Sequence, residues 1–201
     1  MSTPIFLKSA AAPADFPTDA GREVAFVGRS NSGKSTALNS IAGVRRLARV
    51  SKTPGRTQLI NFFEVGRERR LVDLPGYGFA RVADETRDRW RVLCESYLTS
   101  RRSLAGVIVT LDIRRGLTAL DEELLRWLGP RGIRIGFLLT KADQLGHGAS
   151  LNREREIAAR LGPTSNLVRF SALSRLGVPE ARAWIDAWLA DDAPRPVTRE
   201  K

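Results

Sequence analysis

The sequence predicts an α/β fold, a three-layer domain whose mixed, mostly parallel sheet carries helices on both faces. Short apolar stretches alternate with segments of helical period along most of the 201 residues, which is typical of such sheets. A glycine-rich segment beginning at Gly28 separates the first central strand from the first helix. The hydrophobic content of 42% and the charged content of 27% are ordinary for one globular domain.

The N-terminal half contains the expected edge of the sheet. Apolar Ile5, Phe6 and Leu7 predict an edge strand, and the proline-containing segment after it predicts a linker. The elements expected next are a buried strand at 24–27, a helix at 34–42, a basic loop at 44–56, antiparallel strands at 59–65 and 70–72, and a loop at 77–81.

Helices and strands alternate to the end of the second half. Helices are expected at 86–100, 118–128, 151–161 and 179–189, and strands at 107–111, 133–139 and 167–170. Trp184 and Trp188 lie one helical turn apart and are expected to pack on the sheet. The single His147 lies between two glycines and is expected in an exposed turn.

The net charge, the apolar runs and the single cysteine indicate which partners and which cellular location to expect. A formal net charge of +11, carried almost entirely by arginine, would attract polyanions such as nucleic acid, although a composition bias toward arginine would give the same number. No apolar run approaches the roughly 20 residues that span a bilayer, so no membrane insertion is expected. The single Cys94 excludes an internal disulfide, is expected to be a packed thiol, and favours a cytoplasmic location.

The segment Gly28-Arg29-Ser30-Asn31-Ser32-Gly33-Lys34-Ser35 predicts a phosphate-binding loop, because it follows an expected strand and opens an expected helix. Its glycines let backbone N–H groups turn toward phosphates at a helix N-terminus. Lys34 would supply charge to the β- and γ-phosphates, and Ser35 would place a hydroxyl oxygen on Mg²⁺. The alternative is a glycine-rich turn without function.

Two further segments predict contacts with Mg²⁺ and the γ-phosphate. Asp73-Leu74-Pro75-Gly76 follows an expected strand, where the carboxylate can hold a water of the Mg²⁺ shell and Gly76 can offer its N–H. Thr57 lies in the loop after the first helix, from which a threonine can reach Mg²⁺ and the γ-phosphate. A solvent-facing loop threonine remains the alternative.

The segment Thr140-Lys141-Ala142-Asp143 predicts a guanine site. Asp143 would accept two hydrogen bonds from guanine, whereas adenine lacks that pair of donors. Lys141 would cover the base with its aliphatic stem. Ser171-Ala172-Leu173 follows the last strand and would offer the Ala172 N–H to the guanine oxygen. The alternatives are an aspartate helix cap in the first segment and an ordinary turn in the second.

These motifs closely resemble the EngB-type GTPases, the YihA/YsxC group of bacterial ribosome-biogenesis GTP-binding proteins, over nearly the whole chain. The segment 51–63, SKTPGRTQLINFF, resembles the first switch of that family, and 73–80, DLPGYGFA, resembles the second; 111–114, LDIR, continues the match in order. The resemblance implies a P-loop GTPase domain with about six strands. Its implied boundaries are an N-terminal edge strand and linker at 1–22, the GTPase domain at 23–190 and a disordered tail at 191–201.

The resemblance also implies ligands and partners. It implies GTP and GDP, Mg²⁺, a role in assembly of the large ribosomal subunit with contacts to its rRNA, and a link to cell division and septation. A monomer without a DNA partner is expected, and K⁺ is a further candidate ion. The nucleotide-binding residues implied are Gly28, Arg29, Ser30, Asn31, Ser32, Gly33, Lys34, Ser35, Thr36, Gly55, Arg56, Thr57, Gln58, Leu59, Asp73, Leu74, Pro75, Gly76, Thr140, Lys141, Ala142, Asp143, Ser171, Ala172 and Leu173.

The expected reaction is attack of water on the γ-phosphate of GTP. The residues expected to promote it are Lys34, Thr57, Gly76 and Asn31, with Ser35, Thr57 and Asp73 around the metal. Tyr77 occupies the position where many small GTPases carry a water-orienting glutamine, so slow intrinsic turnover is expected. Two other functions stay open: a P-loop ATPase or kinase, and a nucleic-acid-binding module with a residual nucleotide site.

Overall fold

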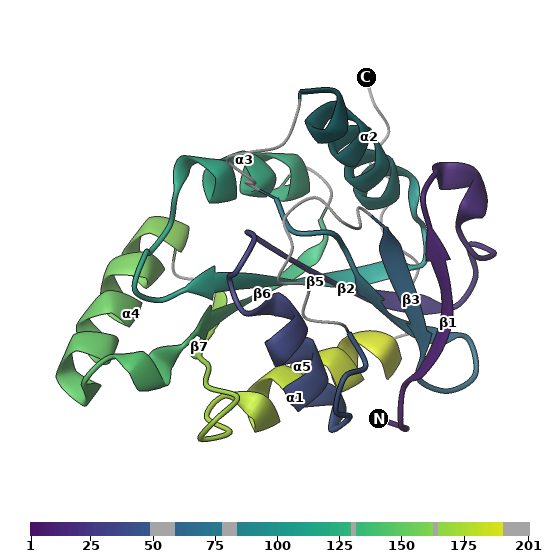
Figure 1. The fold of residues 1–201 in the computed structure, drawn as a ribbon. Helices are drawn as coiled ribbons and strands as arrows, with labels where there is room; N and C mark the ends of the chain where they lie inside the picture. The colour runs from purple at the N-terminus through teal and green to yellow at the C-terminus, as the bar shows by residue number, and fades with distance from the viewer. Residues whose placement is uncertain (49–58, 78–83, 130–131, 163–164, 191–201) are drawn as a thin grey trace.

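The computed structural model describes residues 1–48, 59–77, 84–129, 132–162 and 165–190, which form one sheet with helices on both faces (Figure 1). The sheet has seven strands in the order β1-β3-β4-β2-β5-β6-β7. The strands are β1 Ile5–Ala10, β2 Arg22–Gly28, β3 Ile60–Glu64, β4 Arg69–Asp73, β5 Leu104–Asp112, β6 Arg134–Thr140 and β7 Asn166–Arg169. The predicted α/β class is confirmed. The sheet has one strand more than the number of about six that the resemblance implies, and the edge strand expected at Ile5, Phe6 and Leu7 is confirmed as β1.

Strand direction divides the sheet into two parts. β2, β4, β5, β6 and β7 run parallel to one another. β3 is antiparallel to β4, and β1 is antiparallel to β3, so the predicted antiparallel pair is confirmed. The five parallel strands therefore bring their carboxyl ends to a single edge of the sheet, where ligand sites of open α/β sheets form.

In the part of the chain that the structure describes, five α-helices cover the sheet: α1 Lys34–Ala42, α2 Asp84–Ser100, α3 Ala119–Leu128, α4 His147–Leu161 and α5 Val178–Ala190. The side chains of α1 and α5 pack on one face with Val24 and Phe26, and those of α2, α3 and α4 pack on the other with Ala25 and Val27. This alternation along β2 is the two-residue period of a strand buried on both faces. No helix among the described residues has the length and apolar content needed to cross a bilayer.

The tryptophans of α5 lie against glycines of the sheet, which confirms their predicted packing. A Cβ at Gly106 would lie 2.2 Å from Trp188 Cε3, and a Cβ at Gly136 would lie 2.9 Å from Trp184 Cε3. Two strand glycines therefore make the room in which the indole rings pack on β5 and β6. Cys94 is also buried, and burial raises the pKa of its thiol far above the usual range, which confirms a packed thiol.

Helix α4 begins four residues before the predicted start. His147 is its first residue and lies exposed there, so the predicted turn at this histidine is wrong. Gly146 and Gly148 favour a turn in sequence terms, but a glycine costs only about 1 kcal/mol in a helix. Ile157 packs α4 against the sheet, and tertiary packing of this kind outweighs that cost.

A buried carboxylate ties the N-terminal segment to α2. Glu23 is fully buried and accepts hydrogen bonds from Arg101 at 2.6 and 3.0 Å, from Arg70 at 3.0 Å and from Tyr97 at 2.9 Å. Arg101 also donates to the Pro17 carbonyl oxygen at 2.7 Å. The end of α2 and the segment before β2 thus share one charged cluster.

Candidate functional site

The predicted phosphate loop joins the carboxyl end of β2 to the start of α1. A Cβ at Gly28 would lie 2.1 Å from Thr110 Oγ1, and Gly33 has a φ of +87°, so both positions favour glycine. The hydroxyl groups of Ser32 and Thr110 are 2.7 Å apart, which holds the loop against β5. Close approach to the neighbouring strand β5 therefore shapes the loop.

Lys34 and Asp73 meet beside this loop. Their side chains form an ion pair in which the two groups are 10% and 8% exposed. Lys34 and Ser35 open α1, and Thr36 follows them with an exposed side chain. The loop, Lys34, Ser35 and Asp73 thus lie together, as the sequence predicts for a phosphate and metal site.

The donor set around Asp73 suits Mg²⁺, a hard ion that prefers carboxylate, hydroxyl and phosphate oxygens and keeps several waters. Within the described ranges, no group of three or more His, Cys, Asp or Glu side chains could hold a metal by itself. An ion here would consequently need oxygens from a bound nucleotide in addition to those of Asp73 and Ser35.

The segment after Asp73 runs alongside the phosphate loop. Tyr77 pairs with Arg29 in a parallel bridge, Ser30 N–H donates to the Tyr77 carbonyl oxygen at 2.8 Å, and Tyr77 N–H donates to the Gly28 carbonyl oxygen at 3.2 Å. A Cβ at Gly76 would lie 3.2 Å from the Ser30 nitrogen. Leu74 and Pro75, which precede Gly76, are buried. Gly76 is therefore adjacent to the loop, as predicted for a γ-phosphate contact.

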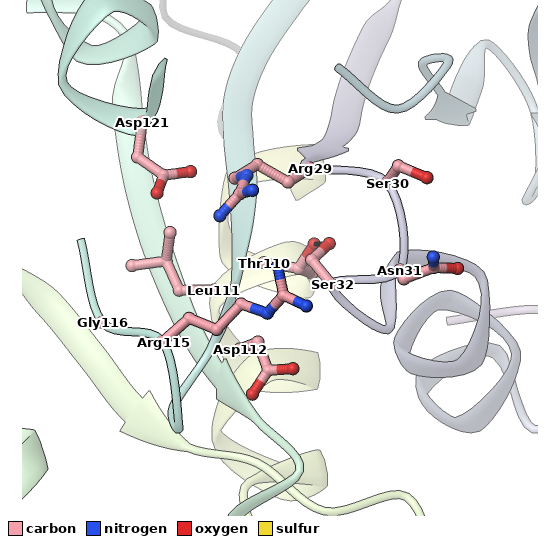
Figure 2. A pocket seen from close by; sticks show the side chains of 10 residues that line it. All are labelled: Arg29, Ser30, Asn31, Ser32, Thr110, Leu111, Asp112, Arg115, Gly116 and Asp121. Atoms are coloured by element: carbon pink, nitrogen blue, oxygen red, sulfur yellow. Dashed lines mark hydrogen bonds between the residues drawn. The ribbon is translucent and has the colours of Figure 1, made fainter. Parts of the chain in front are cut away.

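The side chain of Tyr77 points away from this contact and toward α3. Its hydroxyl donates to Asp121 Oδ1 at 2.6 Å, while Asp121 Oδ2 accepts from the N–H and hydroxyl of Thr118 at 2.8 and 2.7 Å. Burial and the nearby Asp121 raise the pKa of Tyr77 far above its usual range. Arg29 and Asp121 line one open pocket beside the loop (Figure 2). Arg29 Nε is buried and makes no hydrogen bond to the described residues.

The predicted guanine segment lies at the carboxyl end of β6. The Thr140 hydroxyl is buried and within hydrogen-bond distance of the carbonyl oxygens of Ser32 and Leu111. Lys141 adopts a left-handed φ of 61° and donates from Nζ to the Asn31 carbonyl oxygen at 2.7 Å. Lys141 therefore spans from the base-reading segment to the phosphate loop, which fixes the two parts of the site relative to each other.

The second predicted base segment follows β7 and contacts the first. Ala142 N–H donates to the Phe170 carbonyl oxygen at 3.2 Å, next to Ser171, whose buried hydroxyl accepts from Ser174 N–H at 3.2 Å. The side chain of Asp143 is exposed, and that of Leu173 is 85% exposed. The structure thus brings 140–143 and 171–173 together and leaves the Asp143 carboxylate accessible to a base.

Sequence reasoning assigned no role to Asp112, which the structure places inside the site. Asp112 accepts hydrogen bonds from Lys141 at 2.8 Å and from Arg114 at 2.6 and 2.8 Å. Burial raises the pKa of Asp112, but these hydrogen bonds outweigh it and hold the pKa well below its usual range. Its position directly after the expected strand at 107–111 was a signal, because ligand-binding residues of open α/β sheets lie at the carboxyl ends of the strands. For Thr110 and Asp121, no pattern in the sequence indicated that they lie beside the site.

Four predicted site residues, Gly55, Arg56, Thr57 and Gln58, lie outside the described residues. Leu59 is described and precedes β3 with a half-buried side chain. The predicted loop at 77–81 is likewise described only at Tyr77, and the tail at 191–201 lies outside the described ranges. The predictions for these residues therefore stay predictions.

Comparisons with known proteins agree with this geometry. A family described as "50S ribosome-binding GTPase" matches residues 23–141. "Probable GTP-binding protein EngB" from Salmonella paratyphi C is 46% identical over 192 residues, which cover 94% of this chain and 91% of that protein. The protein of the same name from Salmonella typhi shows the same identity and coverage.

Solved structures share the fold at lower identity. A probable GTP-binding protein engB has a TM-score of 0.66 at 22% identity and covers 83% of this chain and 98% of its own. Era in complex with MgGDPNP and nucleotides 1506–1542 of 16S ribosomal RNA has a TM-score of 0.68 at 23% identity, covering 87% of this chain and 59% of its own. At these identities the likeness concerns the fold alone.

Proposed function

The chain belongs to the EngB-type GTP-binding proteins of the 50S ribosome-binding GTPase family, and on this basis we propose that it is a GTP-dependent switch in assembly of the large ribosomal subunit. The chain is a GTPase, which converts GTP and water to GDP and phosphate. Beyond GTP hydrolysis itself, we propose a ribosomal role, the residues that perform the reaction and the ions that assist it.

The contact between Gly76–Tyr77 and the phosphate loop carries the proposal. Gly76 lies against the Ser30 backbone, directly after the strand that ends at Asp73. A third phosphate at the loop would meet the Gly76 N–H, and a diphosphate would not reach it. The segment after Asp73 would then adopt one conformation with GTP bound and another with GDP bound. In this way a switch segment changes its conformation in response to the γ-phosphate.

Lys34 has two alternative partners in this scheme. It pairs with Asp73 in the structure. With GTP bound, its ammonium would contact the β- and γ-phosphates, and Asp73 would face the metal side of the site together with Ser35 and Thr57. Mg²⁺ bound there would neutralise charge on the phosphate oxygens. A cation would thus still compensate the Asp73 carboxylate when Lys34 contacts the phosphates, which a buried carboxylate requires.

Guanine specificity is assigned to Asp143, with Lys141 beneath the base and Ala172 at its oxygen. Asp143 follows directly on a segment that is anchored through Lys141 to Asn31 and Asp112. A carboxylate held at this place rejects adenine, which offers it no pair of donors. This assignment argues against an ATPase or kinase, and the ion-paired Lys34 and Asp73 argue against a residual, inactive site.

Slow hydrolysis follows from the position of Tyr77. Its phenol is hydrogen-bonded to Asp121 on α3 and carries no amide that could orient a water. A partner or an ion must complete the site. K⁺ held near Asn31 is one such ion, because a monovalent cation between the β- and γ-phosphates would stabilise developing charge there.

The partner we propose is the large ribosomal subunit with its rRNA. The net charge of +11 supports an RNA partner, and a role on assembling subunits would place the protein in the cytoplasm. We further propose that the protein acts as a monomer without DNA and that the family link to cell division and septation extends to it.

Co-sedimentation with ribosomal subunits tests this function. Purified large and small subunits are mixed with the protein in GTP, in GDP and without nucleotide, at two salt concentrations. We expect binding to the large subunit that depends on nucleotide and falls as salt rises, since counterions are released when arginines meet phosphates. Equal sedimentation with GTP and GDP, or preference for the small subunit, would contradict the proposal. Affinities for GTP, GDP and ATP measured in parallel test the base preference.

A further inference from the structure

A chain of hydrogen bonds runs through Asp112 from the protein surface to the phosphate loop. Arg114 donates from Nε to Asp112 Oδ1 at 2.8 Å and from Nη2 to Asp112 Oδ2 at 2.6 Å. Lys141 Nζ donates to Asp112 Oδ2 at 2.8 Å and to the Asn31 carbonyl oxygen at 2.7 Å. The Asp112 side chain is 6% exposed, whereas those of Arg114 and Lys141 are 40% and 24% exposed. The Asp112 carboxylate is therefore the buried link between an exposed arginine and the lysine of the guanine segment.

The sheet fixes the position of Asp112. Asp112 ends β5 and is the register partner of Thr140, which ends β6 directly before Lys141. The Ile113 N–H donates to the Thr140 carbonyl oxygen at 3.1 Å, so the chain remains attached to β6 beyond the end of β5. The Asp112 carboxylate thus lies beside Lys141 because two neighbouring parallel strands end at the same level, where the ligand sites of such sheets form.

Arg114 sets the orientation of the Asp112 carboxylate. Its guanidinium donates to both carboxylate oxygens, and its backbone N–H donates to Oδ1 at 3.1 Å. Paired hydrogen bonds of this kind fix two planar groups relative to each other, and here they leave Oδ2 facing the Lys141 ammonium. Burial raises the pKa of Asp112, but the hydrogen bonds from Arg114 and Lys141 lower it well below its usual range. The carboxylate that accepts from Lys141 is therefore ionised at neutral pH.

Lys141 has a long flexible side chain, whose position must be fixed before it can cover a base. Ordering such a side chain costs conformational entropy, and a site that orders it before the ligand arrives binds more tightly. In the structure the Lys141 ammonium already has two acceptors, the Asp112 carboxylate and the Asn31 carbonyl oxygen. With the ammonium held in this way, the aliphatic stem is free to pack against a base.

We propose that Asp112 is a positioning residue for guanine-nucleotide binding, which holds the Lys141 ammonium so that the lysine stem covers the base, and that Arg114 orients Asp112. The inference rests on the proposed role of Lys141 at the base and assigns the residues that make this role possible. GTP and GDP carry the same base, so Asp112 contributes equally to the affinity for both. Because this contribution is the same in the ground state and the transition state, losing it raises KM and leaves kcat unchanged.

A double-mutant cycle tests the inference with Asp112→Asn, Lys141→Met and the variant that carries both substitutions. Asparagine has one acceptor oxygen where aspartate has two, so a donor of Arg114 or Lys141 loses its acceptor. Methionine keeps an unbranched aliphatic side chain and removes the ammonium. Equilibrium binding gives the dissociation constants for GDP and for a non-hydrolysable GTP analogue, and steady-state hydrolysis of GTP gives KM and kcat.

Asp19→Asn is the matched control. It also removes a carboxylate that accepts hydrogen bonds, but Asp19 accepts from the N–H of Ser103, just before β5 begins at Leu104. Asp19 and Asp112 therefore lie at opposite ends of β5, roughly 25 Å apart along the strand. A loss of nucleotide affinity that followed from lower stability alone would occur in both aspartate variants. Urea titration without nucleotide measures the stability of each variant.

We expect Asp112→Asn to weaken the binding of GDP and of the GTP analogue by about tenfold each, the effect of losing one hydrogen bond to a charged group. KM should rise by a similar factor, with kcat unchanged. In the Lys141→Met background, Asp112→Asn should cause no further loss, because Asp112 acts through the ammonium. Asp19→Asn should bind nucleotide like the wild-type protein. Wild-type affinity in Asp112→Asn, losses that multiply in the double variant, or an equal loss in Asp19→Asn would overturn the inference.

Arg114→Gln provides the test if Asp112→Asn does not fold, since the Arg114 side chain is partly exposed and its replacement leaves the core intact. This variant removes the guanidinium that orients Asp112. A smaller rise in KM with unchanged kcat is expected, and a wild-type KM would contradict the inference.

The Lys141→Met variant separates this inference from the function on which it rests. If Lys141→Met binds nucleotide like the wild-type protein, the proposed role of Lys141 at the base fails, and the role of Asp112 fails with it. If Lys141→Met binds nucleotide more weakly and Asp112→Asn does not, the role of Lys141 stands and only that of Asp112 fails.

Discussion

The Tyr77 hydroxyl lies 2.6 Å from Asp121 Oδ1, and both side chains are almost fully buried. This hydrogen bond connects the segment after Asp73, which contacts the phosphate loop, to the first turn of α3. Tyr77 therefore stabilises the fold at a position where many small GTPases carry a residue that orients the attacking water. Its backbone lies against the phosphate loop, and its side chain packs in the hydrophobic core.

Removing the hydroxyl should cost stability. In Tyr77→Phe, Asp121 Oδ1 loses its donor inside the core, so we expect a decrease of about 1–3 kcal/mol in the free energy of unfolding. Urea titration with and without nucleotide measures it. Asp121→Ala should cost more, because it also removes the acceptor for Thr118 at the start of α3. A fully stable Tyr77→Phe protein would show that the hydrogen bond contributes nothing.

Asp143→Asn should lower the affinity for GTP and favour xanthosine triphosphate. Xanthine carries an oxygen where guanine carries its 2-amino group, so the amide donates where the carboxylate accepted. A hydrogen bond to a charged group contributes roughly 1.5–3 kcal/mol, so the loss should be at least tenfold. Competition binding with both nucleotides measures it. Unchanged GTP affinity would remove Asp143 from the base pocket.

Hydrolysis should be about tenfold faster in K⁺ than in Na⁺, a difference of about 1.4 kcal/mol in the barrier. Asn31 has an exposed side chain and a left-handed φ of 63°, and Lys141 holds its carbonyl oxygen. The Asn31 side chain therefore projects from a backbone segment that the hydrogen bond to Lys141 holds in place. Single-turnover rates in the two salts at matched ionic strength give the ratio, and Asn31→Ala should abolish it. Equal rates in the two salts for the wild-type protein would show that Asn31 does not hold K⁺ and only stabilises the loop.

Stability should depend on pH through Asp19. Burial raises its pKa, but the N–H groups of Ser103 and Arg102 and the charge of Arg101 outweigh it and lower the pKa from 3.8 to about 2. A lowered pKa stabilises the fold above about pH 4, and this contribution disappears as the pH falls toward 2. Compared with wild type, Asp19→Asn should therefore be less stable at neutral pH, with the difference vanishing near pH 2. Urea titrations from pH 2 to 7 measure the difference, and a constant gap would contradict the assignment.

Gly106→Ala should disrupt the contact between β5 and α5. The added Cβ would lie 2.2 Å from Trp188 Cε3, and neither strand nor indole can move without disturbing the core. Overpacking of this kind costs about 1–3 kcal/mol or more. Gly148→Ala provides the control, since no heavy atom lies within 4 Å of its Cβ and it lies in α4, where alanine should gain about 0.5–1 kcal/mol.

Local patterns predicted the elements that carry the phosphate loop. The apolar run before Gly28, the glycines at 28 and 33, and the helix opening at Lys34 all lie within about fifteen residues, so propensity and motif agree. The antiparallel pair of β3 and β4 was predictable for the same reason, because a short turn joins the strands.

Contacts between distant segments could not be predicted in this way. Asp112 meets Lys141 because β5 and β6 are neighbours in a register that pairs Asp112 with Thr140. Tyr77 meets Asp121 across 44 residues, and no local pattern marks either as a partner of the other. The start of α4 was missed because its glycines favour a turn, and its helical state depends on packing against the sheet.

Strand β1 is synthesised well before the strand with which it pairs. Its partners are Ile60 to Glu64 of β3, about fifty-five residues further along the chain. At 5–20 residues per second, a ribosome needs roughly three to eleven seconds to synthesise that partner after β1. During that interval Ile5, Phe6 and Leu7 have no sheet to join, and in the finished fold they remain 69%, 56% and 42% exposed. The apolar residues of β1 are therefore open to misassociation during that interval, and slower translation between β1 and β3 would prolong it.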